Sequence, residues 1–240
     1  MNLVIDIGNT LQKCALFDSN DQIGFFEAVE TISIPYLIDL FQKYKIQNAI
    51  YSSVGKIDQE IINFLNNKTH FVILNQNLPL PITIDYSNSA TLGLDRIANG
   101  VGAASLFPNQ NCLSIQVGTC IVYDFVNKNG IYQGGAISPG IDMRFKALQM
   151  QTQNLPLIEK EHIDILIGKD TQQSIKSGVI NGVIFEIDGQ IEAYHRNFED
   201  LKVVLTGGDM FFLKNSIKNQ IFAIPNLVLF GLNKILKLNV

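Results

Sequence analysis

Charged side chains are sparse in this 240-residue chain. Asp, Glu, Lys and Arg together make up 17% of it, and the formal net charge is −4. The sequence has no stripe of Lys and Arg of the kind that neutralises a phosphate backbone, which argues against a dedicated DNA- or RNA-binding protein. Small anionic ligands stay possible, because backbone N–H groups bind anions without a net positive charge.

Cysteine and long apolar runs are also scarce. Cys14, Cys112 and Cys120 are widely spaced and form no CxxC, which argues against a disulfide framework or a zinc site and favours a reducing, cytoplasmic compartment. No apolar run approaches the ~20 residues of a membrane span, and we expect no secretory leader before Asp6. The 47% of hydrophobic residues then indicate a large core, a subunit interface, or both.

Apolar runs alternate with helical periodicity along the chain, and this alternation predicts an α/β fold. Strands are expected over 3–5, 11–17, 23–29, 49–54, 71–74, 113–115, 121–126, 131–137 and 203–205, and helices over 35–45, 58–66, 94–106, 142–150, 171–195 and 227–238. A polar connector at 108–111 predicts a boundary between domains 1–110 and 111–240. The polar stretch 151–160 predicts a mobile connection.

A short pattern occurs twice. Residues 5–9 read IDIGN and residues 115–119 read IQVGT, at an offset of 118 − 8 = 110 residues. In both places an apolar strand ends in a Gly turn and another strand follows. The repeat predicts two similar halves that face each other across a cleft, although apolar–x–apolar–Gly is common enough to recur by chance.

A Gly turn of this kind lets backbone N–H groups approach a phosphate. Neither a GxxxxGK[ST] loop nor a GxGxxG fingerprint after the first strand is present, so the P-loop and Rossmann plans do not apply. The remaining plan is the two-walled phosphate clamp of the actin–hexokinase–sugar kinase ATPases, whose halves are actin-like (ribonuclease H-like).

Four segments, taken in order, carry a more specific resemblance. They are DIGNT at 6–10 with Lys13 behind it, GLDR at 93–96, GT at 118–119, and GGAISPG at 134–140 with TGGD at 206–209. In this order and spacing the chain resembles type III pantothenate kinase, a member of the same superfamily. The resemblance covers almost the whole chain.

The resemblance implies ATP-dependent phosphorylation of the primary hydroxyl of pantothenate, the first step of coenzyme A synthesis. It implies a cytoplasmic homodimer that uses Mg²⁺ with ATP and a monovalent cation, K⁺ or NH₄⁺, and it assigns the role of proton acceptor to Asp95. The implied ATP contacts are Asp6, Ile7, Gly8, Asn9, Thr10, Leu11, Gln12, Lys13, Gly118 and Thr119, and the implied pantothenate contacts are Tyr86, Gly93, Leu94, Asp95, Arg96 and Thr171.

These residue types suit phosphoryl transfer, which asks a protein mainly for positioning and charge stabilisation. The Asp95 carboxylate can accept the proton of an attacking hydroxyl. Arg96 offers a planar donor fork for a carboxylate or a phosphate. Asp6, at a strand end, can hold the hydrated Mg²⁺ that bridges phosphates. Thr171 also suits the N-cap of the following helix, and that alternative stays open.

The chain departs from the family pattern in the loop after Tyr86, where the usual Pro is absent, and at one position that bears on cation binding. The family has Asp where this chain has Gln116, and that Asp ligates the monovalent cation. Gln116 offers an oxygen without a charge, so a weaker cation site and a loss of cation dependence are both open. Two other functions stay open as well: another small-molecule kinase of the superfamily, and a nucleotide-binding regulatory protein with weakened catalysis.

Overall fold

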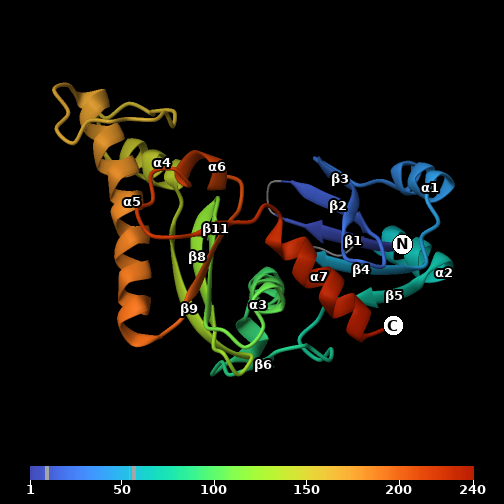
Figure 1. Cartoon of the computed structure of the whole chain (residues 1–240). Coiled ribbons are helices and arrows are strands. Elements are labelled where there is room, and N and C mark those ends of the chain that lie inside the picture. Colours follow the sequence, from blue (N-terminus) through green and yellow to red (C-terminus); the bar gives the residue numbers. More distant parts are fainter. Residues whose placement is uncertain (9–10, 54, 56–57) are drawn as a thin grey trace. The chain divides into compact units, whose positions relative to one another are not determined.

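A computed structural model describes residues 1–8, 11–53, 55 and 58–240 of the chain (Figure 1). The chain divides into two compact units. The first unit comprises Met1–Pro108, Gly130–Gln133 and Asn226–Val240, and the second comprises Asn109–Asn129 and Gly134–Pro225. The division into halves 1–110 and 111–240 was inferred from the sequence repeat and the polar connector, and it stays a prediction.

The first unit contains a five-stranded sheet with the order β3-β2-β1-β4-β5. β1 lies antiparallel to β2 and parallel to β4, and β4 lies parallel to β5. Buried apolar side chains make β1 and β4 inner strands, which is typical of parallel pairs. The strands are β1 (Asn2–Ile7), β2 (Gln12–Phe17), β3 (Ile23–Val29), β4 (Asn48–Ser53) and β5 (His70–Ile73).

The sheet of the second unit repeats this order. Read from its β9 end, it runs β9-β8-β7-β10-β11, with β7 antiparallel to β8 and parallel to β10. β6 (Thr83–Ile84) adds to the start of β9 by pairing with Ile131 and Tyr132. The repeated order confirms the predicted fold class of two actin-like halves. The strands are β7 (Cys112–Val117), β8 (Cys120–Val126), β9 (Ile131–Pro139), β10 (Lys202–Thr206) and β11 (Phe222–Ala223).

The long helices match the predicted ranges within two residues. Asp58 caps α2 by accepting from Glu60 N at 2.9 Å, and Asp170 caps α5 by accepting from Gln173 N at 2.8 Å. The N-cap reading of Thr171 is therefore wrong, because Thr171 is the first residue inside α5. The helices are α1 (Ile34–Lys43), α2 (Gln59–Lys68), α3 (Leu94–Leu106), α4 (Ile141–Gln151), α5 (Thr171–Asn197), α6 (Met210–Leu213) and α7 (Leu227–Leu238), with a 3₁₀ turn at Ser89–Thr91.

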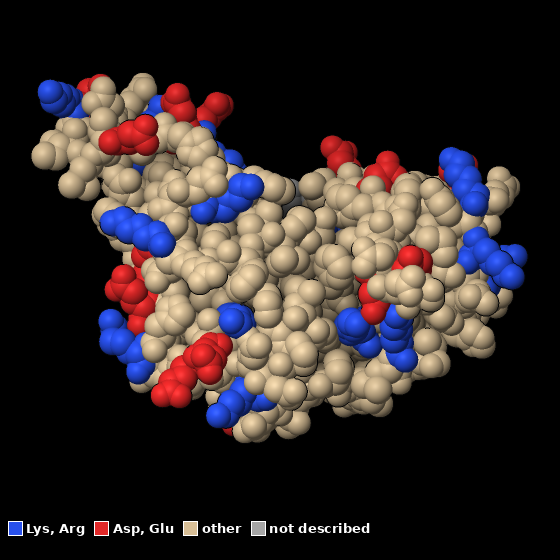
Figure 2. All heavy atoms as spheres, in the orientation of Figure 1, with Lys and Arg blue, Asp and Glu red and all other residues tan. Residues whose placement is uncertain are grey.

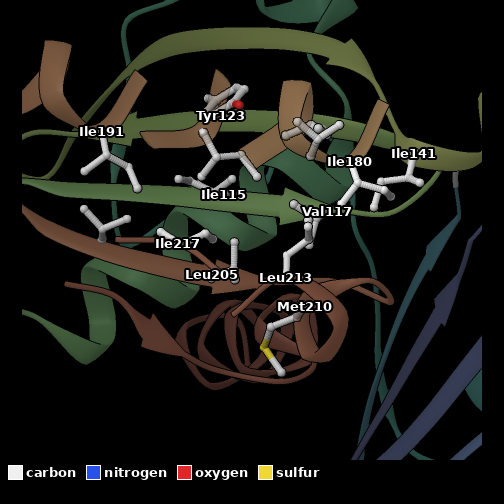
Figure 3. Packing of buried hydrophobic residues seen from close by; sticks show 14 of the residues in the cluster. Ile115, Val117, Tyr123, Ile141, Ile180, Ile191, Leu205, Met210, Leu213 and Ile217 are labelled. Carbon is white, nitrogen blue, oxygen red and sulfur yellow. The ribbon is translucent and has the colours of Figure 1, made fainter. Parts of the chain in front are cut away.

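Each unit has its own hydrophobic core. In the second unit, Ile115 and Val117 of β7 and Leu205 of β10 pack with Ile180 of α5 and Met210 of α6 (Figure 3). In the first unit, apolar side chains of β1, β2 and β4 pack against α1 and α2. The strands that end in the predicted Gly turns are thus central in their cores, which fixes where each turn emerges.

Helix α7 joins the first unit and holds α3 in place. A Cβ on Gly231 would lie 1.8 Å from Ala98 O of α3, so the two helices touch through backbone at that point. Asn233 of α7 accepts from Asn2 Nδ2 of β1 at 2.9 Å. Because α3 carries the predicted Asp95, α7 sets the position of that residue relative to β1. Among the described residues, no helix is long and apolar enough to cross a membrane.

Candidate active site

Three side chains lie side by side on neighbouring strands of the first sheet, at the carboxyl end of β1. Asp6 of β1 is the ladder partner of Lys13 on β2 and of Ser52 on β4. Residues paired in this way point to the same face of a sheet. Ser52 is fully buried, and its Oγ has no hydrogen-bond partner among the described residues. The carboxyl end of β1 therefore carries a carboxylate flanked by an ammonium and a hydroxyl.

Asp6 is itself buried, with 7% of its surface exposed. Burial raises the pKa of its carboxyl from 3.8 to about 6, Lys13 opposes this rise, and the Asp95 carboxylate adds to it. Repulsion by Asp95 means that the predicted metal holder and the predicted proton acceptor lie close together. Such a carboxylate gains from any cation that it can bind.

Asp95 lies in the first turn of α3, where a negative charge is favoured by the helix dipole. Its Oδ1 accepts a hydrogen bond from Arg96 N at 2.9 Å. A Cβ on Gly93 would come within 2.6 Å of the same oxygen. The glycine of the GLDR segment therefore makes room for the carboxylate, and the backbone of Arg96 orients it.

Tyr86 and Arg96 of the predicted pantothenate set contact each other. The Arg96 guanidinium carbon lies 5.8 Å from the centre of the Tyr86 ring, and that ring lies edge-on to Tyr132 with the centroids 6.3 Å apart. Asp85 N donates to Tyr132 O at 2.9 Å, which fixes the loop that carries Tyr86. Arg96 is 8% exposed, so its charge is held in a largely dry position beside Asp95.

The second Gly turn follows β7. Gly118 N donates to Cys120 O at 3.0 Å, and Thr119 is exposed at the tip. Two other glycines pack against this turn through backbone. A Cβ on Gly140 would lie 1.9 Å from Gly118 O, and a Cβ on Gly207 would lie 2.2 Å from Val117 O. The predicted GGAISPG and TGGD segments therefore frame the GT turn.

A polar network fixes the segment before Gly140. Arg144 of α4 donates to Pro139 O at 2.9 Å and pairs with Glu186 of α5. Ser138 also donates to Glu186. Gly140 N in turn donates to Thr119 O at 3.1 Å. The position of Thr119 is therefore set by side chains from two helices that the sequence motifs do not include.

The remaining predicted residues are more scattered. Gln12 Oε1 accepts from Ile32 N at 2.6 Å, which ties its side chain to the fold, and Leu11 is exposed. Gln116 is half-buried in β7, and Thr171 is exposed on α5 in the second unit. Asn9 and Thr10 lie outside the described residues.

Ser52 and Arg144 were missed by the sequence reasoning. Ser52 had a readable signal, because polar residues at the carboxyl ends of parallel strands mark ligand sites in α/β folds. Arg144 had none, since it acts through contacts between elements that are distant in sequence.

The donor set of the first unit fits Mg²⁺ that arrives with a nucleotide. Among the described residues, no three His, Cys, Asp or Glu side chains gather as a metal cage. Mg²⁺ needs no such cage, because it is commonly held by one or two carboxylates together with phosphates and water. The buried Asp6, with Asp95 close by, provides that kind of site.

The repeated sheet order and the glycine-framed GT turn define an actin- and hexokinase-like fold. A glucokinase from an Antarctic psychrotroph shares it with a TM-score of 0.53 at 12% identity, over 98% of both chains. A polyphosphate/ATP-glucomannokinase from Arthrobacter gives a TM-score of 0.50 at 13% identity, over 99% of this chain and 98% of that one. At these identities the likeness shows the fold alone.

Sequence similarity gives the family within this class. The family model for type III pantothenate kinase matches residues 2–193. A type III pantothenate kinase of Cytophaga hutchinsonii is 42% identical over 241 residues and covers 100% of both chains. One of Flavobacterium psychrophilum is 41% identical over 238 residues, or 98% of each chain. The chain belongs to the type III pantothenate kinase family.

Proposed function

We propose that Asp95 is the proton acceptor in the reaction of this chain, the ATP-dependent phosphorylation of pantothenate to 4′-phosphopantothenate. Asp95 is held at the start of α3 with its carboxylate oriented by Arg96 N. A carboxylate in this position can accept the proton of the primary hydroxyl as the hydroxyl oxygen attacks the γ-phosphorus. The bond from that phosphorus to the β,γ-bridging oxygen breaks, and ADP leaves.

The observation that carries this proposal is the orientation of the Asp95 carboxylate at the start of α3, near enough to Asp6 for its charge to raise the pKa of Asp6. Asp6 would hold Mg²⁺ on the ATP phosphates, and Mg²⁺, when bound, neutralises phosphate charge. The hydroxyl that Asp95 deprotonates must lie next to the γ-phosphate. A carboxylate at the end of β1 and a second one in the first turn of α3 satisfy both needs, although they lie far apart in the sequence.

The phosphate contacts come from both Gly turns. In the first unit, we assign them to residues 6–13, with Lys13 supplying a positive charge beside Asp6. In the second unit, we assign them to Gly118 and Thr119. Thr119 is exposed and can meet a ligand, because Gly140 and Gly207 support the turn from other sides.

Arg96 and Tyr86 are the proposed pantothenate contacts beside the proton acceptor. A guanidinium pairs well with a carboxylate, and pantothenate carries one. The ring of Tyr86 stacks near this guanidinium, which restricts the Arg96 side chain before the substrate arrives. Gly93 and Leu94 complete the segment, and Thr171 is the proposed contact from the second unit.

The monovalent cation is a separate part of the proposal. Gln116 stands where the family pattern has Asp, at a half-buried position of β7. An amide oxygen can ligate K⁺ or NH₄⁺, but it adds no charge to hold the ion. We therefore assign a weak cation site to Gln116.

We also propose a homodimer in which α5 faces its symmetry mate. Gly178, Gly182, Phe185 and Gly189 lie on one face of this helix at spacings of four, three and four residues. A Cβ on any of the three glycines would meet no atom within 4 Å, and Phe185 is 55% exposed. Helical glycines cost about 1 kcal/mol each, and a second helix packed closely on this face explains their presence.

A cytoplasmic location completes the proposal, because the reaction consumes ATP and because no cysteine of the described residues lies in a disulfide. The decisive test is a coupled assay of ADP release with pantothenate, ATP and Mg²⁺. We expect turnover that depends on pantothenate and is absent with glucose or mannose as acceptor. ATP binding without turnover on any of these acceptors would contradict the kinase and favour a regulatory nucleotide-binding protein.

A further inference from the structure

The segment 152–170 connects α4 to α5 (Figure 1), and acidic and basic side chains lie on the surface of this part of the chain (Figure 2). Most of its residues are exposed, yet several of them are anchored to the rest of the second unit. Ile158 is buried in the core of the second unit. The ring of His162 stacks on Phe212 of α6 with the centroids 4.2 Å apart. Side chains of α5 hold the far end, where Ser177 Oγ donates to Leu166 O at 2.7 Å. We call this segment the strap.

Lys160 of the strap reaches two carboxylates. Its Nζ lies 2.5 Å from Asp209 Oδ1 and 3.5 Å from Asp142 Oδ2. Only 10% of the Asp209 side chain is exposed, against 58% for Asp142. The hydrogen bond to Asp209 raises the pKa of Lys160, so the lysine is an ammonium ion at neutral pH.

The two carboxylates belong to the two segments that frame the GT turn. Asp142 follows Gly140 by two residues, and Asp209 follows Gly207 by two residues. Asp209 N also donates to Val117 O at 3.1 Å, directly before the turn. Lys160 therefore joins the segments that contact the turn from two sides.

We propose that Lys160 is a positioning residue for the phosphate turn Gly118–Thr119, acting as a tethered cation that ties the Gly140 and Gly207 segments together. Its ammonium bridges Asp142 and Asp209 in the way a bound cation bridges two ligands. The bridge keeps Gly118 and Thr119 in the conformation that meets the nucleotide phosphates.

A simpler role for Lys160 would be to neutralise the buried Asp209 and so to stabilise the fold. An unpaired buried charge is strongly destabilising, whatever its function. The two roles differ when both charges are removed. In a Lys160→Met, Asp209→Asn double variant, neutralisation is no longer needed, but the bridge to Asp142 is still missing.

This inference rests on the proposed kinase function only for its kinetic consequences. Its structural core is the effect of Lys160 on the turn, which can be measured without catalysis. Gly140 N donates to Thr119 O and Asp209 N to Val117 O. The hydrogen exchange of these two amides reports how firmly the turn is framed.

The experiment compares Lys160→Met with Lys176→Met, which removes another lysine that pairs with the strap, at Glu161. We expect faster exchange of the Gly140 and Asp209 amides in Lys160→Met and in the double variant, and unchanged exchange in Lys176→Met. In the kinase assay, the KM for ATP of Lys160→Met should rise roughly 10- to 100-fold, while the KM for pantothenate stays near its original value.

Chemical rescue sharpens the test. In a Lys160→Ala variant the position between the two carboxylates is vacated, so methylammonium ions should restore part of its ATP affinity and leave the unsubstituted chain unaffected. Unchanged amide exchange in Lys160→Met would overturn the proposal, as would full recovery of exchange and ATP affinity in the double variant. A failure of kinase turnover in the unsubstituted chain would contradict the proposed function, and the exchange measurement would still decide the role of Lys160.

Discussion

Asp6 and Ser52 are ladder partners at the carboxyl ends of β1 and β4, and both side chains are buried. The Asp6 carboxyl has its pKa raised to about 6, chiefly by burial, and the Ser52 hydroxyl has no partner among the described residues. The strand ends thus hold a buried carboxyl whose charge is poorly stabilised and a buried hydroxyl without a hydrogen-bond partner among the described residues. A bound cation with its water or phosphate ligands would stabilise both groups.

The first prediction concerns Asp95. In Asp95→Asn the amide oxygen can still accept from Arg96 N, so the geometry of the GLDR segment should persist. The loss of a proton acceptor should lower kcat roughly 10²- to 10⁴-fold. Steady-state kinetics test this, with thermal unfolding and ATP binding as controls expected to stay unchanged. A variant of near-normal kcat would remove Asp95 from the role of base.

The second prediction is that the ionised Asp6 carboxylate lowers the free energy of unfolding. Folding raises the pKa of the Asp6 carboxyl, so this carboxyl binds its proton more tightly in the folded chain than in the unfolded chain. Well below pH 4, Asp6 is protonated in both states. The free energy of unfolding therefore falls as pH rises from about 4 through 6. The difference between 3.8 and about 6 corresponds to roughly 3 kcal/mol at 1.36 kcal/mol per pKa unit. Asp6→Asn should therefore raise the free energy of unfolding at pH 8 by about 1–3 kcal/mol, while its kinase activity is largely lost.

Urea unfolding at pH 8 and pH 4 measures this effect, and the gain should vanish at pH 4. Asp39→Asn is the matched control, because Asp39 forms an exposed pair with Lys43 on α1, and its pH profile should follow that of the unsubstituted chain. If Asp6→Asn is less stable at pH 8 than the unsubstituted chain, the prediction is wrong. The contacts of the ionised Asp6 carboxylate would then outweigh the cost of burying it.

The third prediction uses two neighbouring glycines. Gly207 has φ +99°, and a Cβ there would lie 2.2 Å from Val117 O, whereas a Cβ on Gly208 would meet nothing within 4 Å. Gly207→Ala should lower the free energy of unfolding by about 2 kcal/mol or more and weaken ATP binding through the GT turn. Gly208→Ala should leave the unfolding midpoint unchanged. Equal midpoints for the two variants would refute the close packing of Gly207.

The fourth prediction concerns the monovalent cation. Replacement of Gln116 by Asp adds a charge at the proposed cation site, so activity should come to depend more steeply on K⁺ or NH₄⁺. Gln116→Glu, with the same charge on a longer side chain, serves as a control for position. The assay is a cation titration against constant ionic strength. An identical K⁺ response in Gln116→Asp and in the unsubstituted chain would reject the assignment of this residue.

The fifth prediction concerns the dimer. Phe185→Glu places a charge in the proposed α5 interface, and the chain should then sediment as a monomer at concentrations where the unsubstituted chain is a dimer. Phe211→Glu is a matched control, because Phe211 is also exposed, at 62%, but lies on α6. Sedimentation velocity distinguishes the two. If Phe185→Glu stays dimeric, α5 is not the interface.

Much of the fold could be predicted from periodicity and apolar runs. Helices α3 and α7 begin and end at the predicted residues, and the long strands were found. The short β6, β11 and α6 were missed, because elements of two to four residues carry no periodic signal. The polar stretch 151–160 was predicted to be mobile, and the structure instead attaches it through Ile158 and Lys160.

The sequence by itself determined the order of the motifs, and with it the family and the residue types of the site. The motifs can be recognised in the sequence because each Gly turn and the GLDR segment is formed by residues that are neighbours in the chain. The tertiary structure alone decided which of these residues meet. Strand register placed Ser52 beside Asp6, and the packing of α3 on α7 set Asp95 near β1. Contacts of this kind depend on side chains from elements far apart in the chain, and no local pattern encodes them.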